Sequence, residues 1–409
     1  MTKLAVVAVL LAACVPSRSS TFGPVGREVS RRIGVDAGWY ASTDGRVPAA
    51  VSSLLAKPLD RDAAVRIALA MNRRLQAQYD ELGIAASEVA AATVLAPLEV
   101  DIEYKRALEG DGTELEIDAT QDILDLIQIP QRRDIAQAAL AATRARAVAA
   151  TVSLVARVEA AYVDVVAAEQ ELELRQTAFD AASAAADITE RMAAAGNVPE
   201  LQLARERDQR EQARIELARA QGEVEVRREG LNDLLGVSGA DTKWTTAGRL
   251  PDVPTAPPAL DALERDAIAA SLDLQALRSD EQAAAGRVGV ARLRSWLPEL
   301  GVGVAASRAD DGWEVGPALS IGIPLLNQQQ GPRARANAEI RRARNEAMGT
   351  ATALRATARA TRQRVLTAYA EARHTREVVL PLRQRILDET LKQYNAMNAS
   401  TFELLSARR

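Results

Sequence analysis

Hydrophobic and polar residues alternate in two pairs of short segments of this 409-residue chain. In residues 98–104 and 114–119, every second position is mostly apolar and the positions between are acidic. In residues 300–305 and 313–323 the apolar positions are separated mainly by small residues. This period of two, with Gly and Asp between the segments of each pair, predicts two β-hairpins. A tilted membrane strand and a half-buried soluble strand show the same alternation, so the pattern alone does not distinguish them.

Long helical segments follow each hairpin. Residues 131–194 contain no Pro or Gly, and their valines recur at the four- and three-residue steps of a coiled-coil seam. About 64 residues at about 1.5 Å each predict a rod of roughly 96 Å. A second rod is expected from about 333 to 396, with a kink at Pro381. Pro130 and Pro332 stand where the two helices are expected to begin.

The order of these segments indicates an internal duplication. Four landmarks recur in the same order about 200 residues apart, among them Ile127-Gln-Ile-Pro130 and Ile321-Gly-Ile-Pro324, which we expect to end strands. The fold class is therefore mainly α with β, built from a first repeat at 58–250 and a second at 251–409. The first repeat continues about 36 residues beyond its helical turn and the second only about eight, so we expect a C-terminally truncated chain without the final return helix.

The N-terminus indicates export and lipid attachment. Residues 1–13 have the short apolar run of a signal peptide, and Leu11-Ala-Ala-Cys14 matches the bacterial lipobox. We expect acyl chains on Cys14 to anchor the protein to membrane lipid. Residues 14–57, rich in Gly, Ser and Pro, are expected to form an irregular tether.

Composition excludes several classes of chemistry. Aromatic residues make up 3% of a chain that is 48% hydrophobic, which argues against one large globular core. One Cys and one His cannot build a zinc cluster or a disulfide framework, and we expect no catalytic residues, metal site or cofactor. A net charge of −4 gives no nucleic-acid signature.

Membrane crossing would have to use the strands, because beyond the N-terminus no apolar run approaches about 18 residues. Four strands per chain cannot close a barrel, and open sheet edges are not tolerated in lipid. Membrane strands therefore imply an oligomer. Two chains would supply 8 strands and three would supply 12, and the wider barrel suits continuation into a hollow helical cylinder.

Over residues 58–409 the chain resembles TolC-type outer-membrane efflux proteins. The markers are the duplicated strand-and-rod units, the Ile-x-Ile-Pro segments, the opening at Pro58-Leu59 and the stretch from Tyr394 to Leu405. The resemblance implies a homotrimer with a 12-strand transmembrane β-barrel on a long α-helical coiled-coil tunnel. It places the barrel in the outer membrane of a Gram-negative bacterium and the helices in the periplasm.

The function implied by the resemblance is a passive exit duct of a tripartite efflux system, not an enzyme. Its partners would be a periplasmic adaptor (membrane fusion) protein and an inner-membrane efflux pump, and metal ions or toxic compounds are candidate cargo. The alternative is a non-channel periplasmic coiled-coil protein with a structural or adaptor role.

Three sets of residues are candidates for that function. The acidic strand positions are expected to face the lumen and favour cations, namely Glu99, Asp101, Glu103, Glu114, Glu116 and Asp118. By resemblance, pore-constriction candidates are Glu403, Gln202 and Ser406, although an exposed helix glutamate is an equal interpretation of Glu403. The two helical turns would be adaptor-docking tips, formed by Gly196, Asn197 and Val198 and by Met397, Asn398 and Ala399.

Overall fold

The computed structural model describes residues 17–40, 49–106, 113–309, 312–324, 330–400, 403–404 and 407. The chain divides into two compact units. Unit 1 comprises Met1–Trp39, Gln76–Ala150 and Ala267–Arg355, and unit 2 comprises Tyr40–Leu75, Thr151–Asp266 and Ala356–Arg409. Each sequence repeat therefore contributes segments to both units, which are described in turn below.

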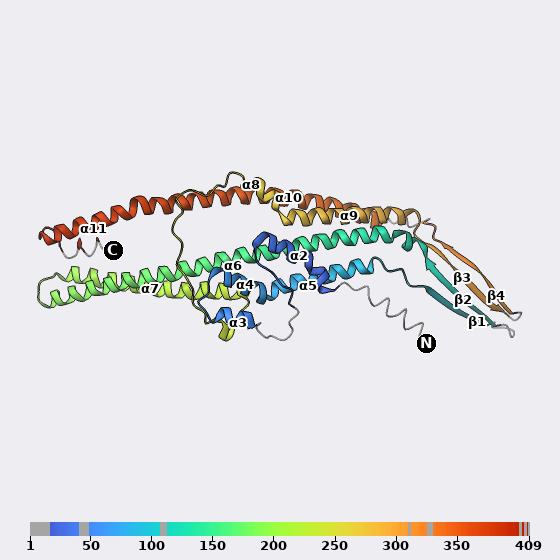
Figure 1. The fold of residues 1–409 in the computed structure, drawn as a ribbon, viewed down its shortest axis with the longest axis horizontal. Helices are drawn as coiled ribbons and strands as arrows, with labels where there is room; N and C mark the ends of the chain where they lie inside the picture. The colour runs from blue at the N-terminus through green and yellow to red at the C-terminus, as the bar shows by residue number, and fades with distance from the viewer. Residues whose placement is uncertain are drawn as a thin grey trace. The chain divides into compact units, whose positions relative to one another are not determined.

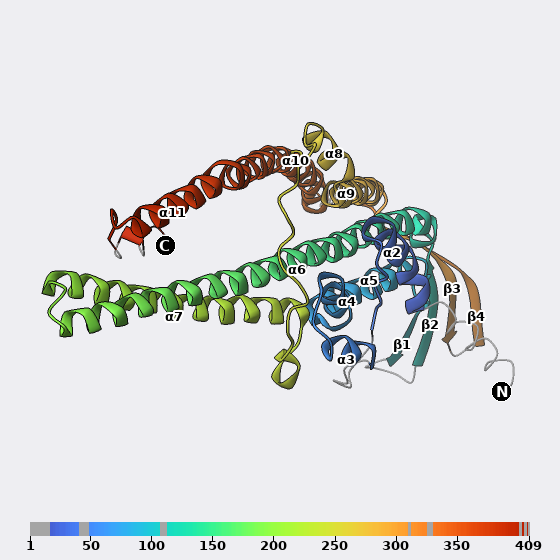
Figure 2. The same cartoon turned by 60° about the vertical axis from the view of Figure 1, so that its left-hand side comes forward.

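Unit 1 contains one antiparallel four-stranded sheet with the order β1-β2-β3-β4 (Figure 2). The strands are β1 (Glu99–Arg106), β2 (Thr113–Asp122), β3 (Leu300–Ala309) and β4 (Gly312–Ile321). Both hairpins expected from the alternation are present. The pairing of β2 with β3 joins the hairpin of the first repeat to that of the second.

The helices of unit 1 include α2 (Arg18–Ile33), α5 (Arg73–Ala91) and α9 (Leu272–Trp296). Helix α2 corrects the prediction that residues 14–57 form an irregular tether. Ser17 caps it, and its valines Val25 and Val29 are buried at a helical spacing. The Phe22 ring packs edge-on against Tyr79 of α5 at 4.9 Å, so burial of one helix face overrides the turn-forming composition.

Helix α6 (Ile123–Ala194) begins eight residues earlier than the sequence predicts. The Asp122 carboxylate accepts hydrogen bonds from the backbone N–H groups of Leu124 (2.8 Å) and Asp125 (3.2 Å) and so satisfies donors at the helix start. The prediction that Ile127–Pro130 ends a strand is wrong, since this segment is helical and Pro130 lies inside the helix. In the second repeat, Ile321 does end β4.

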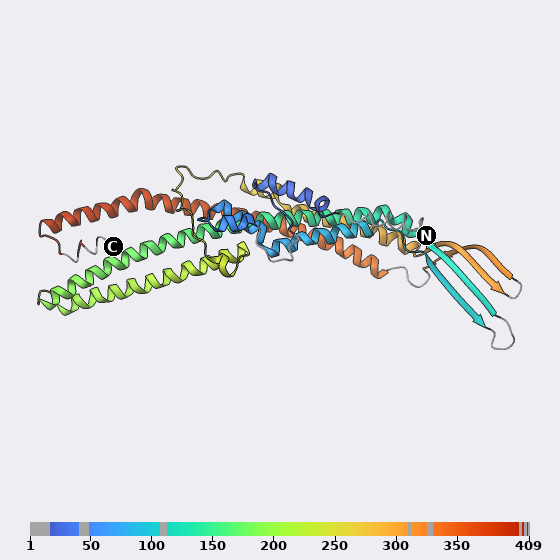
Figure 3. The ribbon, with the colours of Figure 1, turned by 60° about the horizontal axis from the view of Figure 1, so that its bottom comes forward.

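Unit 2 contains α3 (Ala49–Leu55), α4 (Arg61–Met71), the C-terminal part of α6, α7 (Glu200–Leu235) and the short η2 (Gly239–Thr242). α6 and α7 run antiparallel as the expected helical hairpin (Figure 3). The buried Tyr162 hydroxyl donates to the Leu59 carbonyl at 3.0 Å, and the Trp244 indole N–H donates to Asn232 at 2.8 Å. These hydrogen bonds satisfy the Tyr162 hydroxyl and the Trp244 indole N–H, which are buried where other segments of unit 2 pack on α6 and α7.

The second long helix is interrupted near Pro381, as the sequence predicts. It consists of α10 (Gln330–His374), a π-helical turn labelled η3 (Thr375–Val379) and α11 (Leu380–Asn395), and its colour runs from orange to red in Figure 1. The Leu380 N–H donates to the Thr375 carbonyl, five residues back. Pro381 has no N–H to donate, and the wider turn directly before it accommodates that loss.

The segment that joins the two repeats, residues 250–262, leads into α8 (Leu263–Ala270) and contacts α10 within unit 2. The Tyr369 hydroxyl donates to the Thr255 carbonyl at 3.3 Å, and Arg362 contacts Asp261 at 2.9 Å. Among the described helices, we find none with enough consecutive apolar residues to cross a membrane.

Candidate functional site

The strand register gives the sheet of unit 1 two chemically different faces. Asp101 stands opposite Asp118, and Glu103 opposite Glu116. Directly opposed residues of an antiparallel pair share a face, and alternate residues of each strand do the same. All six candidate acids therefore lie on one face, which we call the acidic face: Glu99, Asp101, Glu103, Glu114, Glu116 and Asp118.

The opposite face is apolar across all four strands. We call it the apolar face, and its members are Val100, Ile102, Tyr104, Leu115, Ile117, Ala119, Val302, Val304, Ala306, Val315, Pro317, Leu319 and Ile321. Ile102 is 68% exposed and Val315 is 70% exposed. Near the second hairpin turn the same face carries Trp313, with the Arg308 guanidinium 5.8 Å from its ring centroid. An exposed apolar surface of this extent, bordered by Trp and Arg, is typical of a membrane-contacting surface.

The acidic face also contains charged residues that our selection of candidates missed. The Lys105 Nζ lies 3.1 Å from carboxylate oxygens of both Glu103 and Glu116, and Glu314 stands opposite Ser307 on the same face. The alternation in the sequence could have placed both residues on this face, because Lys105 lies two residues after Glu103 and Glu314 lies between the apolar Trp313 and Val315. Asp122, which ends β2 and caps α6, shares this face as well, so the face carries eight acids and one base rather than six acids alone.

In unit 2, both candidate tips adopt the same turn. The N–H groups of Gly196 and Asn197 donate to Ala193 and Met192, and those of Met397 and Asn398 donate to Tyr394 and Gln393, all at 2.8–3.0 Å. This is the two-bond pattern that ends a helix with one left-handed residue. That residue is Gly196 (φ 75°) in the first tip and, unusually, Met397 (φ 60°) in the second.

A cavity of about 600 Å³ lies between the two tips. Its lining comes from both turns and includes Asn197 and Val198 of the first tip and Met397 and Ala399 of the second. The structure thus brings together two segments that are about 200 residues apart in the sequence. Gln202 also lines this cavity, together with Glu206, a 2% exposed acid that our sequence selection missed because it lies on a strongly charged helix.

Glu403 has a local structural role. Its carboxylate accepts a hydrogen bond from the Ser400 N–H at 2.7 Å, while the Ser400 hydroxyl accepts one from the Glu403 N–H at 3.2 Å. This reciprocal pair is a capping box at the start of a helical turn. The corresponding positions of the first tip are Pro199 and Gln202. Ser406 and Cys14 lie outside the described residues.

We expect this cap to weaken in acid. Hydrogen bonds from the backbone N–H and the hydroxyl of Ser400 lower the pKa of the Glu403 carboxyl. A depressed pKa in the folded state means that the cap stabilises fully above the unfolded value of about 4.3 and is lost as pH falls through the folded pKa. Hydrogen exchange at the Ser400 amide, corrected for intrinsic rates, should show this loss of protection.

Glu403→Gln provides the control, because glutamine keeps the capping geometry without an ionisable carboxyl. The variant should retain protection across the same acidic range. An identical acid-induced loss in the variant would show that another group controls the turn.

In the described residues, no group of three or more His, Cys, Asp or Glu side chains is placed to hold a metal ion.

Comparisons with known proteins add independent information. Residues 100–237 match the family model described as outer membrane efflux protein. The chain is also 24% identical over 363 residues to the cobalt-zinc-cadmium resistance protein CzcC of Cupriavidus metallidurans, covering 87% of this chain and 84% of that protein.

Solved structures share the fold. The VceC outer membrane protein of Vibrio cholerae aligns with a TM-score of 0.66 and 17% identity, covering 85% of this chain and 88% of that one. The CmeC outer membrane channel of Campylobacter jejuni aligns with a TM-score of 0.64 and 18% identity, covering 85% of this chain and 79% of that one. Each similarity therefore extends over most of this chain.

Proposed function

This chain belongs to the outer-membrane efflux protein family, and on that premise we propose that three copies close a 12-strand barrel and form a passive exit duct for cargo. As a member of the family, the protein is an efflux channel of the Gram-negative outer membrane with its helices in the periplasm. The trimer, the lumen surface, the partners and the cargo are our proposals.

The observation that carries the proposal is the two-faced sheet. Its apolar face is exposed, its acidic face is strongly charged, and in the described chain the outer edges of β1 and β4 have no further strand partner. Unpaired strand edges cannot remain open in lipid. Pairing β4 of one copy with β1 of the next satisfies both edges, and three four-stranded sheets give a closed barrel with the apolar face toward lipid and the acidic face inside.

The remaining assignments follow from the same arrangement. We assign the two tips in unit 2, with the cavity between them, as the surface that meets a periplasmic adaptor fed by an inner-membrane pump. Gln202 lines this cavity and Glu403 caps the adjoining turn, so we retain them, with Ser406, as constriction candidates. Acyl chains on Cys14 would attach the N-terminus to membrane lipid.

Metal cations are the cargo class that we favour. The name of the CzcC relative refers to cobalt, zinc and cadmium resistance. A lumen lined by carboxylates raises the local concentration of cations by electrostatic attraction. The acids act here as a charged surface and not as fixed metal ligands.

Crosslinking of membrane fractions tests the assembly directly. We expect a crosslinked trimer of the full chain in the outer-membrane fraction. Soluble or inner-membrane monomers would contradict the proposal and favour the non-channel coiled-coil alternative.

We expect the reconstituted channel to prefer cations, and Lys105→Gln to increase that preference. The substitution removes the positive charge that neutralises Glu103 and Glu116. Reversal potentials across planar bilayers under a salt gradient measure the change, which should be largest at low ionic strength. Glu116→Gln should shift the reversal potential in the opposite direction.

Arg106→Gln is the matched control. Arg106 is adjacent to Lys105 in β1 but lies on the opposite face of the sheet, across from Thr113. Arg106→Gln removes the same charge as Lys105→Gln, at nearly the same position along β1, yet should leave ion selectivity unchanged. An anion-preferring channel, or equal shifts from the two substitutions, would contradict the assignment of the acidic face to the lumen.

A further inference from the structure

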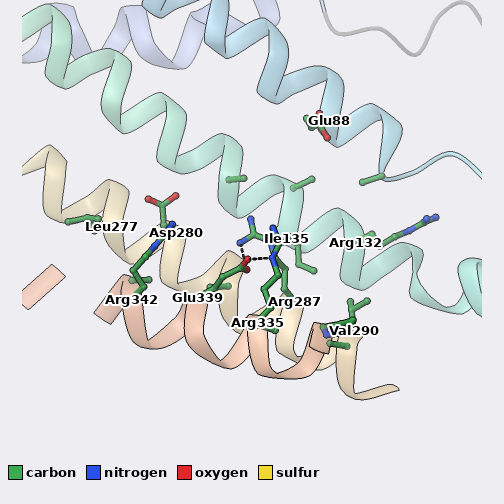
Figure 4. A pocket seen from close by; sticks show the side chains of 18 of the residues that line it. Glu88, Arg132, Ile135, Leu277, Asp280, Arg287, Val290, Arg335, Glu339 and Arg342 are labelled. Carbon is green, nitrogen blue, oxygen red and sulfur yellow. Dashed lines mark hydrogen bonds and ion pairs between the residues drawn. The ribbon is translucent and has the colours of Figure 1, made fainter. Parts of the chain in front are cut away.

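Unit 1 contains a cavity of about 1170 Å³ that the proposed function does not use. Four helices line it, namely α5, α6, α9 and the N-terminal part of α10 (Figure 4). Its most distinctive feature is a set of six arginines: Arg132, Arg146, Arg287, Arg294, Arg335 and Arg342. Four acids, Glu88, Asp280, Glu339 and Glu346, also line it.

The arginines occur at regular helical spacing. Arg287 and Arg294 of α9 are seven residues apart, as are Arg335 and Arg342 of α10, and the two arginines of α6 are fourteen apart. Seven residues are nearly two helical turns, so each pair projects from one helix face. Three helices thus direct guanidinium groups toward the same space.

Two carboxylates are each shared by two of these arginines: Glu339, which lines the cavity, and Asp125, which does not. Glu339 accepts from Arg335 at 2.9 Å and lies 3.7 Å from Arg287, and Figure 4 shows both side chains converging on it from α10 and α9. We call this group the Glu339 triad. In the Asp125 triad, Asp125 contacts Arg132 at 3.1 Å and also contacts Arg294. Each triad contains two positive charges and one negative charge.

The triads have more hydrogen-bond donors than their acids can accept. Two guanidinium groups offer about ten N–H donors, whereas one carboxylate offers about four acceptor sites. In the Asp125 triad the buried Arg132 Nε has no hydrogen-bond partner among the described residues. Two neutral oxygens take part of the surplus, since Arg132 also donates to the Val94 carbonyl at 3.3 Å and Arg294 to the Gln128 side chain at 3.1 Å. The other charges on the lining do not remove the rest, because Arg146 pairs with Asp280 and Arg342 with Glu346, while Glu88 stands apart on α5 (Figure 4).

We propose that this cavity binds a soluble anion bearing at least two phosphate or carboxylate groups, which bridges the Glu339 and Asp125 triads. The planar guanidinium matches the paired oxygens of both groups. Arg287 and Arg294 are separated by about 10 Å along α9, which sets the span of the ligand. Only the choice of a soluble anion over a lipid headgroup rests on the proposed function, because that choice assumes that the strands span the membrane.

The position of the cavity favours a soluble ligand over a lipid headgroup. Arg287 lies nine residues before the end of α9 at Trp296, which corresponds to about 14 Å of helix, and three further residues precede β3. The headgroup layer on one side of a bilayer is only about 5–8 Å thick. If the strands span the membrane, the Glu339 triad lies beyond that layer.

Calorimetric titration of the full-length, detergent-solubilised protein with inorganic tripolyphosphate tests the site, in buffer free of divalent cations. We expect saturable binding that weakens with salt and is at least about tenfold tighter than binding of monophosphate, because only the longer anion can engage both triads. Arg287→Gln and Arg335→Gln should each weaken binding about tenfold.

The direction in which Glu339→Gln changes the affinity for tripolyphosphate is the decisive result. It removes the negative charge while keeping the side-chain shape, and should tighten binding about fivefold. Arg341→Gln, an exposed α10 position outside the cavity lining, should leave affinity unchanged. Absence of binding, weakening by Glu339→Gln, or an equal loss in Arg341→Gln would overturn the proposal, the last by indicating nonspecific attraction.

The outcome is separable from that of the proposed function. Binding is measured in detergent and requires no conducting channel. A protein that conducts ions but binds no tripolyphosphate contradicts this inference alone, whereas one that binds tripolyphosphate but forms no channel contradicts the duct and leaves the anion site in place.

Discussion

Gly236→Ala should destabilise the protein by about 3 kcal/mol, the largest effect that we expect from a single methyl group. Gly236 ends α7 in the left-handed region at φ 73°. A Cβ there would lie 2.7 Å from the Met71 carbonyl oxygen and 3.1 Å from the Asn72 Cα. Because these neighbours are backbone atoms at the end of α4, they cannot move aside as a flexible side chain can.

The measurement is the midpoint of thermal or chemical unfolding of the purified protein, followed by far-ultraviolet circular dichroism. Fluorescence of Trp244 offers a local probe, because its indole N–H donates to Asn232, four residues before Gly236. We expect a lower midpoint and earlier exposure of this buried ring.

Gly230→Ala is the matched control in the same helix. A Cβ at Gly230 would meet nothing within 4 Å. Alanine in an exposed helix interior is favoured over glycine by about 0.5–1 kcal/mol, so this variant should be slightly more stable. Equal destabilisation by both substitutions would show that the close approach of α4 and α7 is not the cause.

Gly303→Ala should have the second largest effect, a loss of about 2 kcal/mol concentrated on the sheet. A Cβ at Gly303 of β3 would contact the Ala119 carbonyl oxygen of β2 and lie 2.9 Å from the Thr120 Cα. This is the boundary at which the two repeats join. Forcing β2 and β3 apart would break the only hydrogen-bonded ladder between the two hairpins in the described sheet. The fraction of protein that folds into the membrane should therefore fall sharply.

The fraction of protein that resists protease in outer-membrane preparations measures this effect. Gly316→Ala is the control, because Gly316 lies on the same face of the sheet in β4 and a Cβ there meets nothing within 4 Å. It should behave like the unmodified protein. If Gly303→Ala retains full protease resistance, the close approach of β2 and β3 is not required for assembly.

The regular elements were predictable because their periods are strong and local. The alternation of Val100, Ile102 and Tyr104 with acids determined both the strand and its two faces, and the register confirms the shared face. The absence of Pro and Gly over residues 131–194 likewise predicted most of α6. These signals depend on neighbouring residues in one element and need no knowledge of the rest of the chain.

Other features depended on contacts that no local pattern contains. Helix α2 forms in a segment rich in Gly, Ser and Pro because Phe22, Val25 and Val29 are covered by other parts of unit 1. Pro130 lies inside α6 and does not begin it, because the helix starts where Asp122 caps it, eight residues upstream. Met397 occupies a left-handed position that sequence preference would give to glycine.

The sequence by itself determined the mainly helical class, the duplicated plan, the two hairpins and the acidic and apolar faces, because period and parity are properties of the chain. Only the tertiary structure decided that β2 pairs with β3, that the two tips share one cavity and that six arginines from three helices surround another. These arrangements join residues far apart in the sequence. They are set by packing and charge pairing between elements, which local preferences do not specify.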